Sequence, residues 1–227
     1  MTGEGLEPDP GARVRATGSR AIPAAVRIAC IAALLGLSMR IFILQPVSVP
    51  SESMEPALLP GDLLIAEKYP YGYSSASLPW TSRVDPEASR IGLRLPRRGD
   101  VVIFADPRNS GDYYVKRVAG LPGETLSLEN GDLIVDGRLV ALAARANALD
   151  ARANVAAVRI PEGMLFVLGD NRAKSLDSRF SAADGGFGFV PLSALVGRAG
   201  PILFSIAPPG EDGWFSRLRL SRIGKRP

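Results

Sequence analysis

Two serines in the first quarter of the chain have the spacing of a nucleophile and a neighbouring hydrogen-bond donor. They lie in the segment PSESMEP at residues 50–56, where prolines restrain the backbone. If this segment is extended, Ser51 and Ser53 point to the same side, because side chains two residues apart share a face. One hydroxyl could then attack a carbonyl carbon while the other donates to the developing oxyanion. The alternative is a Ser/Pro-rich linker without a chemical role, and this segment taken alone favours that alternative.

The base that such a serine needs cannot be a histidine, because the 227 residues contain none. This excludes a Ser-His-Asp triad, a Cys-His pair and a histidine metal site. Cys30 is the only cysteine, so the chain has neither an internal disulfide nor a cysteine cluster for zinc or iron–sulfur. It lies inside an apolar run, which favours a buried small hydrophobe over a reactive thiol. The base must be a carboxylate, a lysine or a metal-bound water.

Lysine is scarce in this chain. Four lysines among the 27 basic residues leave 23 arginines, and arginine does not give up its proton in proteins. The lysines are Lys68, Lys116, Lys174 and Lys225. We expect the first to be solvated because it follows a glutamate and precedes a loop. The third lies in a polar loop and the fourth in the C-terminal tail.

Lys116 differs from the other three because it lies within a predicted strand. Strand alternation puts it on one face with Tyr114 and Val118. A lysine on a partly apolar face loses hydration, which lowers its pKa toward the range that a base needs near neutral pH. The alternative is an exposed lysine on an edge strand, and the residues leave both interpretations open.

A third polar segment, GDNRAKSLDSR at residues 169–179, directly follows an apolar strand. Asp177 and Arg179 could form an ion pair that holds this loop. Ser175 could orient a neutral lysine amine through a hydrogen bond. A polar surface loop or a calcium loop are the alternatives, although carboxylates are few for calcium and no suitable terminal glutamate follows.

Residues 21–44 are long and apolar enough to cross a membrane. The part from Ile28 to Leu44 has only Ser38 and Arg40 as polar residues, and a spanning helix needs roughly 20 residues. A buried core helix and a cleaved signal peptide compete with this interpretation. No amphipathic face supports the first, and no Ala-x-Ala site follows Leu44 to support the second. We predict a retained anchor.

The charges around the anchor predict its orientation. Four arginines and no acid lie between residues 10 and 27, so the positive-inside rule puts the N-terminus in the cytoplasm and the rest outside. Residues 1–20 are predicted to be a disordered cytoplasmic tail. The net charge is +4, but no basic-aromatic stripe or helix-turn-helix pattern occurs, so we expect no nucleic-acid partner.

Residues 45–227 are predicted to form a mainly antiparallel β domain with long loops. Short apolar runs alternate with turn signals, and 70–97 reads as a long loop. Asn-Gly at 130 and Asp-Gly at 136 flank an apolar run and predict hairpins. Residues 141–159 read as a weak helix or a loop. The predicted strands are 62–66, 100–104, 113–118, 133–135 and 164–168, with 190–196 and 202–206 closing the core.

These segments, in this order, resemble the type I signal peptidases, the bacterial leader peptidases of family S26 with a serine/lysine dyad. The likeness covers roughly residues 30–224 and rests on several ordered boxes after an anchor. The boxes are PSESMEPALLPGD at 50–62, RRGDVVIFADP at 97–107, YYVKRVAGLPGE at 113–124, GDNRAKSLDSR at 169–179, GFVP at 188–191 and LRLSRIG at 218–224.

The resemblance implies a role for each matching residue. It makes Ser53 the nucleophile and Lys116 the general base. The Ser51 hydroxyl and the main-chain N–H of Ser53 would form the oxyanion hole, and Ser175 would orient the lysine. The residues implied to give structural support are Asp177 and Arg179.

The resemblance also implies a membrane-bound serine endopeptidase that removes signal peptides from exported preproteins after small residues. Its partners would be preproteins and the phospholipid bilayer, with no metal or cofactor. Its place would be the bacterial inner membrane, with a periplasmic catalytic domain. Glu52 and Glu55 depart from the family pattern, and we expect both to point to solvent. Residues 181–186 look inserted, and 121–160 could be a cap.

Three other interpretations remain at this point. A self-cleaving Ser/Lys protease of the repressor type would have the same dyad, but such proteins lack an anchor. A pilus- or conjugation-type peptidase would share the dyad and cut fewer substrates. A non-enzymatic anchored β domain that binds envelope partners would need neither hydroxyl nor amine.

Overall fold

The computed structural model describes residues 23–78, 84–108, 111–142, 154–209 and 217–227. The chain divides into two compact units, residues 1–36 and 37–227. The expected tail at 1–20 lies outside the described residues. Helix α1 spans Ala24–Phe42 and is, by length and composition, able to cross a membrane. None of its residues is buried, so the core-helix alternative and the expectation of a buried Cys30 are both wrong.

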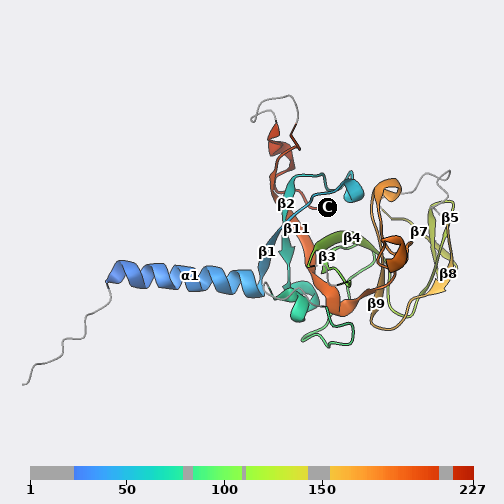
Figure 1. The fold of residues 1–227 in the computed structure, drawn as a ribbon, viewed down its shortest axis with the longest axis horizontal. Coiled ribbons are helices and arrows are strands. Elements are labelled where there is room, and N and C mark those ends of the chain that lie inside the picture. Colours follow the sequence, from blue (N-terminus) through green and yellow to red (C-terminus); the bar gives the residue numbers. More distant parts are fainter. Residues whose placement is uncertain (1–22, 79–83, 109–110, 143–153, 210–216) are drawn as a thin grey trace, which may run out of the picture. The chain divides into compact units, whose positions relative to one another are not determined.

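Seven strands form the larger sheet, in the order β1-β2-β11-β3-β4-β9-β10 (Figure 1). All its pairings are antiparallel, which confirms the predicted fold class. Valine, isoleucine and leucine fill its core together with the ring of Phe104. The strands are β1 Leu44–Ser48, β2 Asp62–Glu67, β3 Val101–Ala105, β4 Tyr113–Gly120, β9 Met164–Leu168, β10 Val190–Pro191 and β11 Leu195–Ser205.

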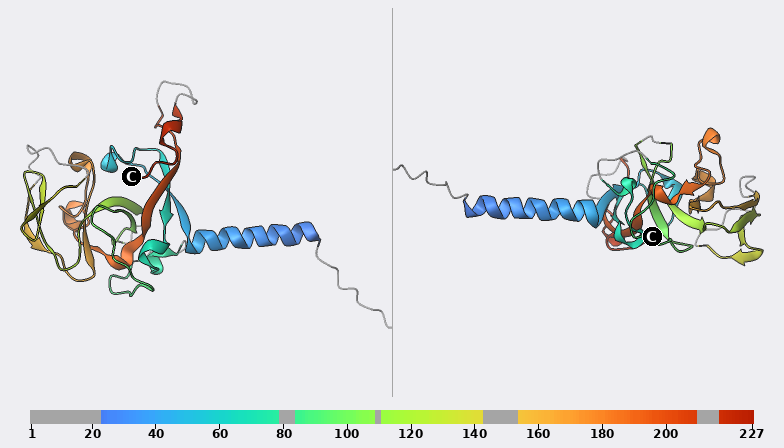
Figure 2. Two further views of the ribbon diagram at one scale, coloured as in Figure 1. Left: turned by 180° about the vertical axis from the view of Figure 1, so that it is seen from behind. Right: turned by 90° about the horizontal axis from the view of Figure 1, so that it is seen from below.

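A smaller sheet of four strands, in the order β7-β6-β5-β8, has an apolar cluster of its own (Figure 2). Asn130 and Asp136 both have positive φ and each precedes a glycine with positive φ, which confirms the predicted hairpin turns. The sheet lies within residues 121–160, and its status as a separate cap stays a prediction. Its strands are β5 Thr125–Glu129, β6 Asp132–Val135, β7 Arg138–Val140 and β8 Val155–Arg159.

Two predictions for local structure were wrong. Val155–Arg159 is a strand rather than a helix or loop, because backbone pairing with β5 overrides its alanine-rich sequence. Most of the remaining part of 141–159, residues 143–153, lies outside the described residues. β11 is one strand of 11 residues where the sequence predicts two shorter segments. The pairing of β11 with β2 and β3 shifts register at several points along the strand. Gly197 lies so close to β2 that a Cβ there would be 2.3 Å from the Glu67 carbonyl oxygen.

Lys68 is fully buried, so the expectation of a solvated side chain is wrong. Its Nζ donates to the carbonyl oxygens of Arg40 at 3.1 Å, Ile41 at 3.2 Å and Ser77. The first two belong to the last turn of α1, where carbonyls have no partner within the helix. Burial, and then the nearby Arg40, lower the pKa of Lys68 to about 8. Three N–H donors match three carbonyls, so the ammonium caps the helix end.

Candidate active site

Ser53 lies in a short 3-10 turn, Glu52–Met54, that follows β1. The expected extended segment is therefore wrong beyond Ser51, because the Glu55 N–H donates to the Glu52 carbonyl and closes the turn. The Met54 side chain is almost fully buried and anchors this turn in the core. The two hydroxyls still meet, since Ser51 Oγ lies 3.2 Å from Ser53 Oγ.

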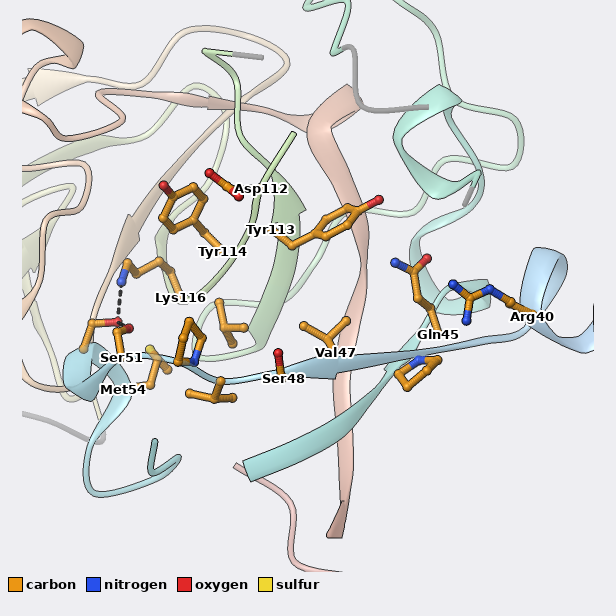
Figure 3. A pocket seen from close by; sticks show the side chains of 15 residues that line it. Arg40, Gln45, Val47, Ser48, Ser51, Met54, Asp112, Tyr113, Tyr114 and Lys116 are labelled. Carbon is orange, nitrogen blue, oxygen red and sulfur yellow. Dashed lines mark hydrogen bonds between the residues drawn. The ribbon is translucent and has the colours of Figure 1, made fainter. Parts of the chain in front are cut away.

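Lys116 reaches Ser53 from strand β4. Its side chain is buried, and its Nζ donates to Ser53 Oγ at 2.6 Å, across 63 residues of sequence (Figure 3). Burial is the main cause that lowers the pKa of Lys116 to about 8; Arg179 lowers it further, and Asp177 and Asp170 oppose the shift. About a tenth of the amines would then be neutral at pH 7.

The Asp177 and Arg179 side chains form a buried ion pair, with Arg179 Nε 2.8 Å from Asp177 Oδ1. Asp177 also accepts the Gly169 N–H at 3.0 Å, and Arg179 donates to the Ser175 carbonyl at 3.1 Å. These bonds fix the polar loop 169–179 at the end of β9, next to the turn that carries Ser53.

A second buried ion pair was missed by the sequence analysis. Arg117 donates to both oxygens of Asp170, at 2.7 and 2.6 Å. It clamps the strand of Lys116 to the polar loop, and the Asn171 N–H donates to the Ser53 carbonyl at 3.0 Å. The signal was present, since Arg117 directly follows the candidate base and Asp170 is the acid of the Gly-Asp-Asn-Arg box. Nothing local connected the two boxes.

Ser175 lies in this loop with its hydroxyl buried. Among the described residues its Oγ has no hydrogen-bond partner, and Lys116 Nζ donates to Ser53 instead. Gly169 makes room for it, because a Cβ there would be 2.2 Å from the Ser175 Oγ. A buried unpaired hydroxyl costs about 1–3 kcal/mol of stability, so a hydrogen bond to this group would be favourable.

The two glutamates beside Ser53 do not shift the pKa of Lys116. Glu52 is exposed and forms an ion pair with Lys174, as expected for a side chain that points to solvent. Glu55 is partly exposed. Neither is among the charges that shift the pKa of Lys116. An exposed pair of this kind contributes little to stability, because solvent screens it.

A channel of about 580 Å³ leads from the serine and lysine to the end of α1. It runs between β1 and the start of β4, and Figure 3 shows its lining side chains. Strand β1 is an edge strand that pairs only with β2 within the sheet, so an extended peptide has a free strand edge beside it. Within the part of the chain that is described, no group of three or more carboxylates or cysteines is arranged to hold a metal ion.

Comparison with known proteins identifies the family. The family model described as "Signal peptidase, peptidase S26" matches residues 22–204. A signal peptidase I of Rickettsia typhi is 31% identical, over 84% of this chain and 88% of that protein. The Rickettsia rickettsii signal peptidase I is 32% identical, over 86% and 88%.

Among solved structures, a signal peptidase I from Enterococcus faecalis shares 33% sequence identity with this chain. The match covers 46% of this chain and 97% of that one, with a TM-score of 0.37. The family match spans most of the chain, and relatives above 30% identity align with it over most of their own length. This chain belongs to the signal peptidase family, peptidase S26, and is a serine endopeptidase.

Proposed function

We propose that this protein is a membrane-bound peptidase that cleaves signal peptides from exported preproteins after small residues. Ser53 is the nucleophile and Lys116 the general base. The single observation that carries this assignment is the 2.6 Å hydrogen bond between the buried Lys116 Nζ and Ser53 Oγ, at the end of a channel open to an extended peptide. Membership of the peptidase family supports it.

The chemistry is acyl transfer. The neutral amine of Lys116 accepts the Ser53 proton as Oγ bonds to the scissile carbonyl carbon. The oxyanion receives hydrogen bonds from the Ser51 hydroxyl and the Ser53 N–H. The lysinium then protonates the amine of the mature protein as the C–N bond breaks. Lys116 next takes a proton from water as its oxygen bonds to the acyl carbon. The bond between that carbon and Ser53 Oγ then breaks, Lys116 returns the proton to Oγ, and the signal peptide leaves as a carboxylic acid.

The surrounding residues support this reaction by holding the amine. Asp177 and Arg179 fix the polar loop, and Arg117 with Asp170 fixes the strand of the base. Ser175 has a buried hydroxyl without a partner, which we assign to orienting Lys116 once substrate is bound. Catalytic hydrogen bonds commonly tighten only in the substrate complex. No metal or cofactor takes part in the proposed steps.

Substrate selection follows from the alternation of an extended chain. The first and third residues before the scissile bond share one face of a bound peptide. Val47 lies in β1 and Val49 directly follows this strand. Both are buried, line the channel and are also two residues apart. Side chains that pack closely against this surface must be small.

Helix α1 supplies the membrane anchor in this proposal. Its length and composition suit a bilayer, and the arginines that precede it assign the N-terminus to the cytoplasm. The catalytic domain then stands on the periplasmic side of the bacterial inner membrane. Exported preproteins emerge on that side, so the enzyme meets its substrates there.

A purified-protein assay tests the function. The full chain in lipid vesicles is mixed with a preprotein, and the product is identified by N-terminal sequencing. We expect one cut after a small residue, unaffected by EDTA, and a loss of cleavage when that residue is changed from alanine to leucine. Equal cleavage of the leucine substrate, or inactivation by EDTA, would refute the proposal. Failure of serine-directed acylating probes to label the protein would favour a binding domain.

The Ser51→Ala variant tests the oxyanion hole. Losing one side-chain donor to the oxyanion should lower kcat by about 10²-fold, because the donor acts on charge that develops in the transition state. Preprotein cleavage measured under saturating substrate checks this. Ser127→Ala, in β5 of the small sheet, is the matched control and should cleave like the wild type. An unchanged kcat in Ser51→Ala would remove the hydroxyl from the mechanism.

A further inference from the structure

The end of the channel farthest from the nucleophile contains a buried amide with an unused oxygen. Gln45, in β1, is 5% exposed and lines the channel, yet its Oε1 has no hydrogen-bond partner among the described residues. In Figure 3 its side chain rises from β1 toward the side of Tyr113, beside Arg40.

Within the described part of the chain, the fold leaves the oxygen of this amide without a hydrogen bond. Gln45 is paired with Ala66 across β1 and β2 through the backbone. An unpaired buried polar atom lowers stability, whereas an apolar side chain of the same shape at this position would not. A buried amide that lines a channel and has an unused oxygen is available to a ligand that brings its own hydrogen-bond donor.

The alternation of β1 indicates which ligand residue meets Gln45. Gln45, Val47 and Val49 are the buried residues of this segment, two apart, and Leu44–Ser48 alternates with exposed positions. An extended peptide along this edge presents every second side chain to the same face. If its first and third residues before the scissile bond meet Val49 and Val47, its fifth residue meets Gln45. This assignment rests on the proposed function.

The charges at this end of the channel restrict the chemistry further. Arg40 lies beside Gln45, whereas Asp112 lies toward Tyr114 in Figure 3, so a positively charged donor would be repelled at this end. An uncharged donor avoids this repulsion. Asparagine and glutamine side chains can donate to the Gln45 oxygen while accepting from its NH2 group.

We propose that Gln45 forms a polar subsite for the fifth residue before the scissile bond, and that it selects an uncharged hydrogen-bond donor there. The subsite adds to the preference for small residues near the cut.

Matched preproteins test the subsite first in the wild-type protein. Asparagine is compared with leucine, which is close to it in shape, at the fourth, fifth and sixth positions before the cut. We expect kcat/KM to favour asparagine by about 3- to 10-fold at the fifth position alone, as for one net hydrogen bond. The neighbouring positions face away from Gln45 and should show no such preference. Equal values at the fifth position would overturn the subsite.

Variants of Gln45 then assign the effect. Gln45→Met keeps the length of the side chain without its amide and should bring the asparagine-to-leucine ratio at the fifth position to about one. Gln45→Glu keeps an acceptor and should retain the preference. Ser127→Ala is the control and should keep the wild-type ratio. An unchanged ratio in Gln45→Met would overturn the proposal.

A structural role for Gln45 makes a different prediction. If Gln45 has only a structural role, Gln45→Met should have a lower melting temperature and should cleave all substrates more slowly by the same factor. That result would also overturn the subsite. Our proposal expects no loss of melting temperature. Failure of the wild type to cleave any preprotein would overturn the proposed function and the subsite together, whereas cleavage without a preference at the fifth position would overturn the subsite alone.

Discussion

Changing Lys116 to methionine should reduce kcat/KM for a preprotein by about 10⁴-fold or more. The reason is that Ser53 loses the amine that lies 2.6 Å from its hydroxyl and that accepts its proton in the proposed mechanism. Methionine keeps most of the stem that is buried in the core, so the fold should survive. Lys116→Arg should be equally inactive, because a guanidinium cannot take the proton.

Cleavage of a purified preprotein, with circular dichroism on each variant, measures this effect. Lys225→Met is the matched control, because the Lys225 side chain is exposed in the C-terminal segment and its carbonyl, which bonds the Ile202 N–H, is unchanged. A folded Lys116→Met protein with wild-type activity would refute the dyad.

The pH dependence of the wild type should report the same amine. The pKa of Lys116 is lowered to about 8, chiefly by burial, and only the neutral amine can accept the serine proton. The value of kcat/KM should therefore rise with pH and level off above about pH 8. Stability should also rise between about pH 8 and the ordinary lysine pKa of 10.5, because the unfolded chain binds more protons there.

Lys68 also has a lowered pKa, so the pH dependence of stability has a second source, whereas the pH dependence of activity depends on Lys116 alone. The pKa of Lys68 is lowered to about 8. The stability rise should persist in part in Lys116→Met, whereas the activity profile should vanish with the base. An activity profile that is flat from pH 6 to pH 10 in the wild type would contradict a lysine base.

Changing Ser53 to alanine should abolish cleavage to the same extent, because no acyl-enzyme can form without its oxygen. The substitution removes only the hydroxyl group from a turn that Met54 anchors in the core, so the structure should be retained. Mass spectrometry after incubation with an acylating inhibitor provides the direct readout. The wild type should carry the acyl group on Ser53, and Ser53→Ala should carry none.

Ser51→Ala is the control for this experiment. It retains the nucleophile and the base, so it should still be labelled at Ser53, more slowly than the wild type. Labelling of Ser51 in the Ser53→Ala protein would mean that the neighbouring hydroxyl, 3.2 Å away, is the true nucleophile. Undiminished cleavage by Ser53→Ala would rule out the mechanism.

The chain's own residue types determined the class of chemistry. Without histidine, and with arginine as the usual cation, a serine hydrolase had few possible bases, and only Lys116 lay in an apolar strand. The hairpins at Asn130 and Asp136 were equally readable, because positive φ is a local requirement that few residues meet. The ordered boxes added the family resemblance.

Tertiary structure alone decided which groups meet. Ser53 and Lys116 come within 2.6 Å because β4 has one particular register, and a slip by one residue would turn the amine to the other face. Burial of Lys68, the Arg117–Asp170 pair and the unpaired oxygen of Gln45 likewise depend on contacts between distant segments. Local sequence encodes backbone preference and reactivity, whereas burial and distance are properties of the packed chain.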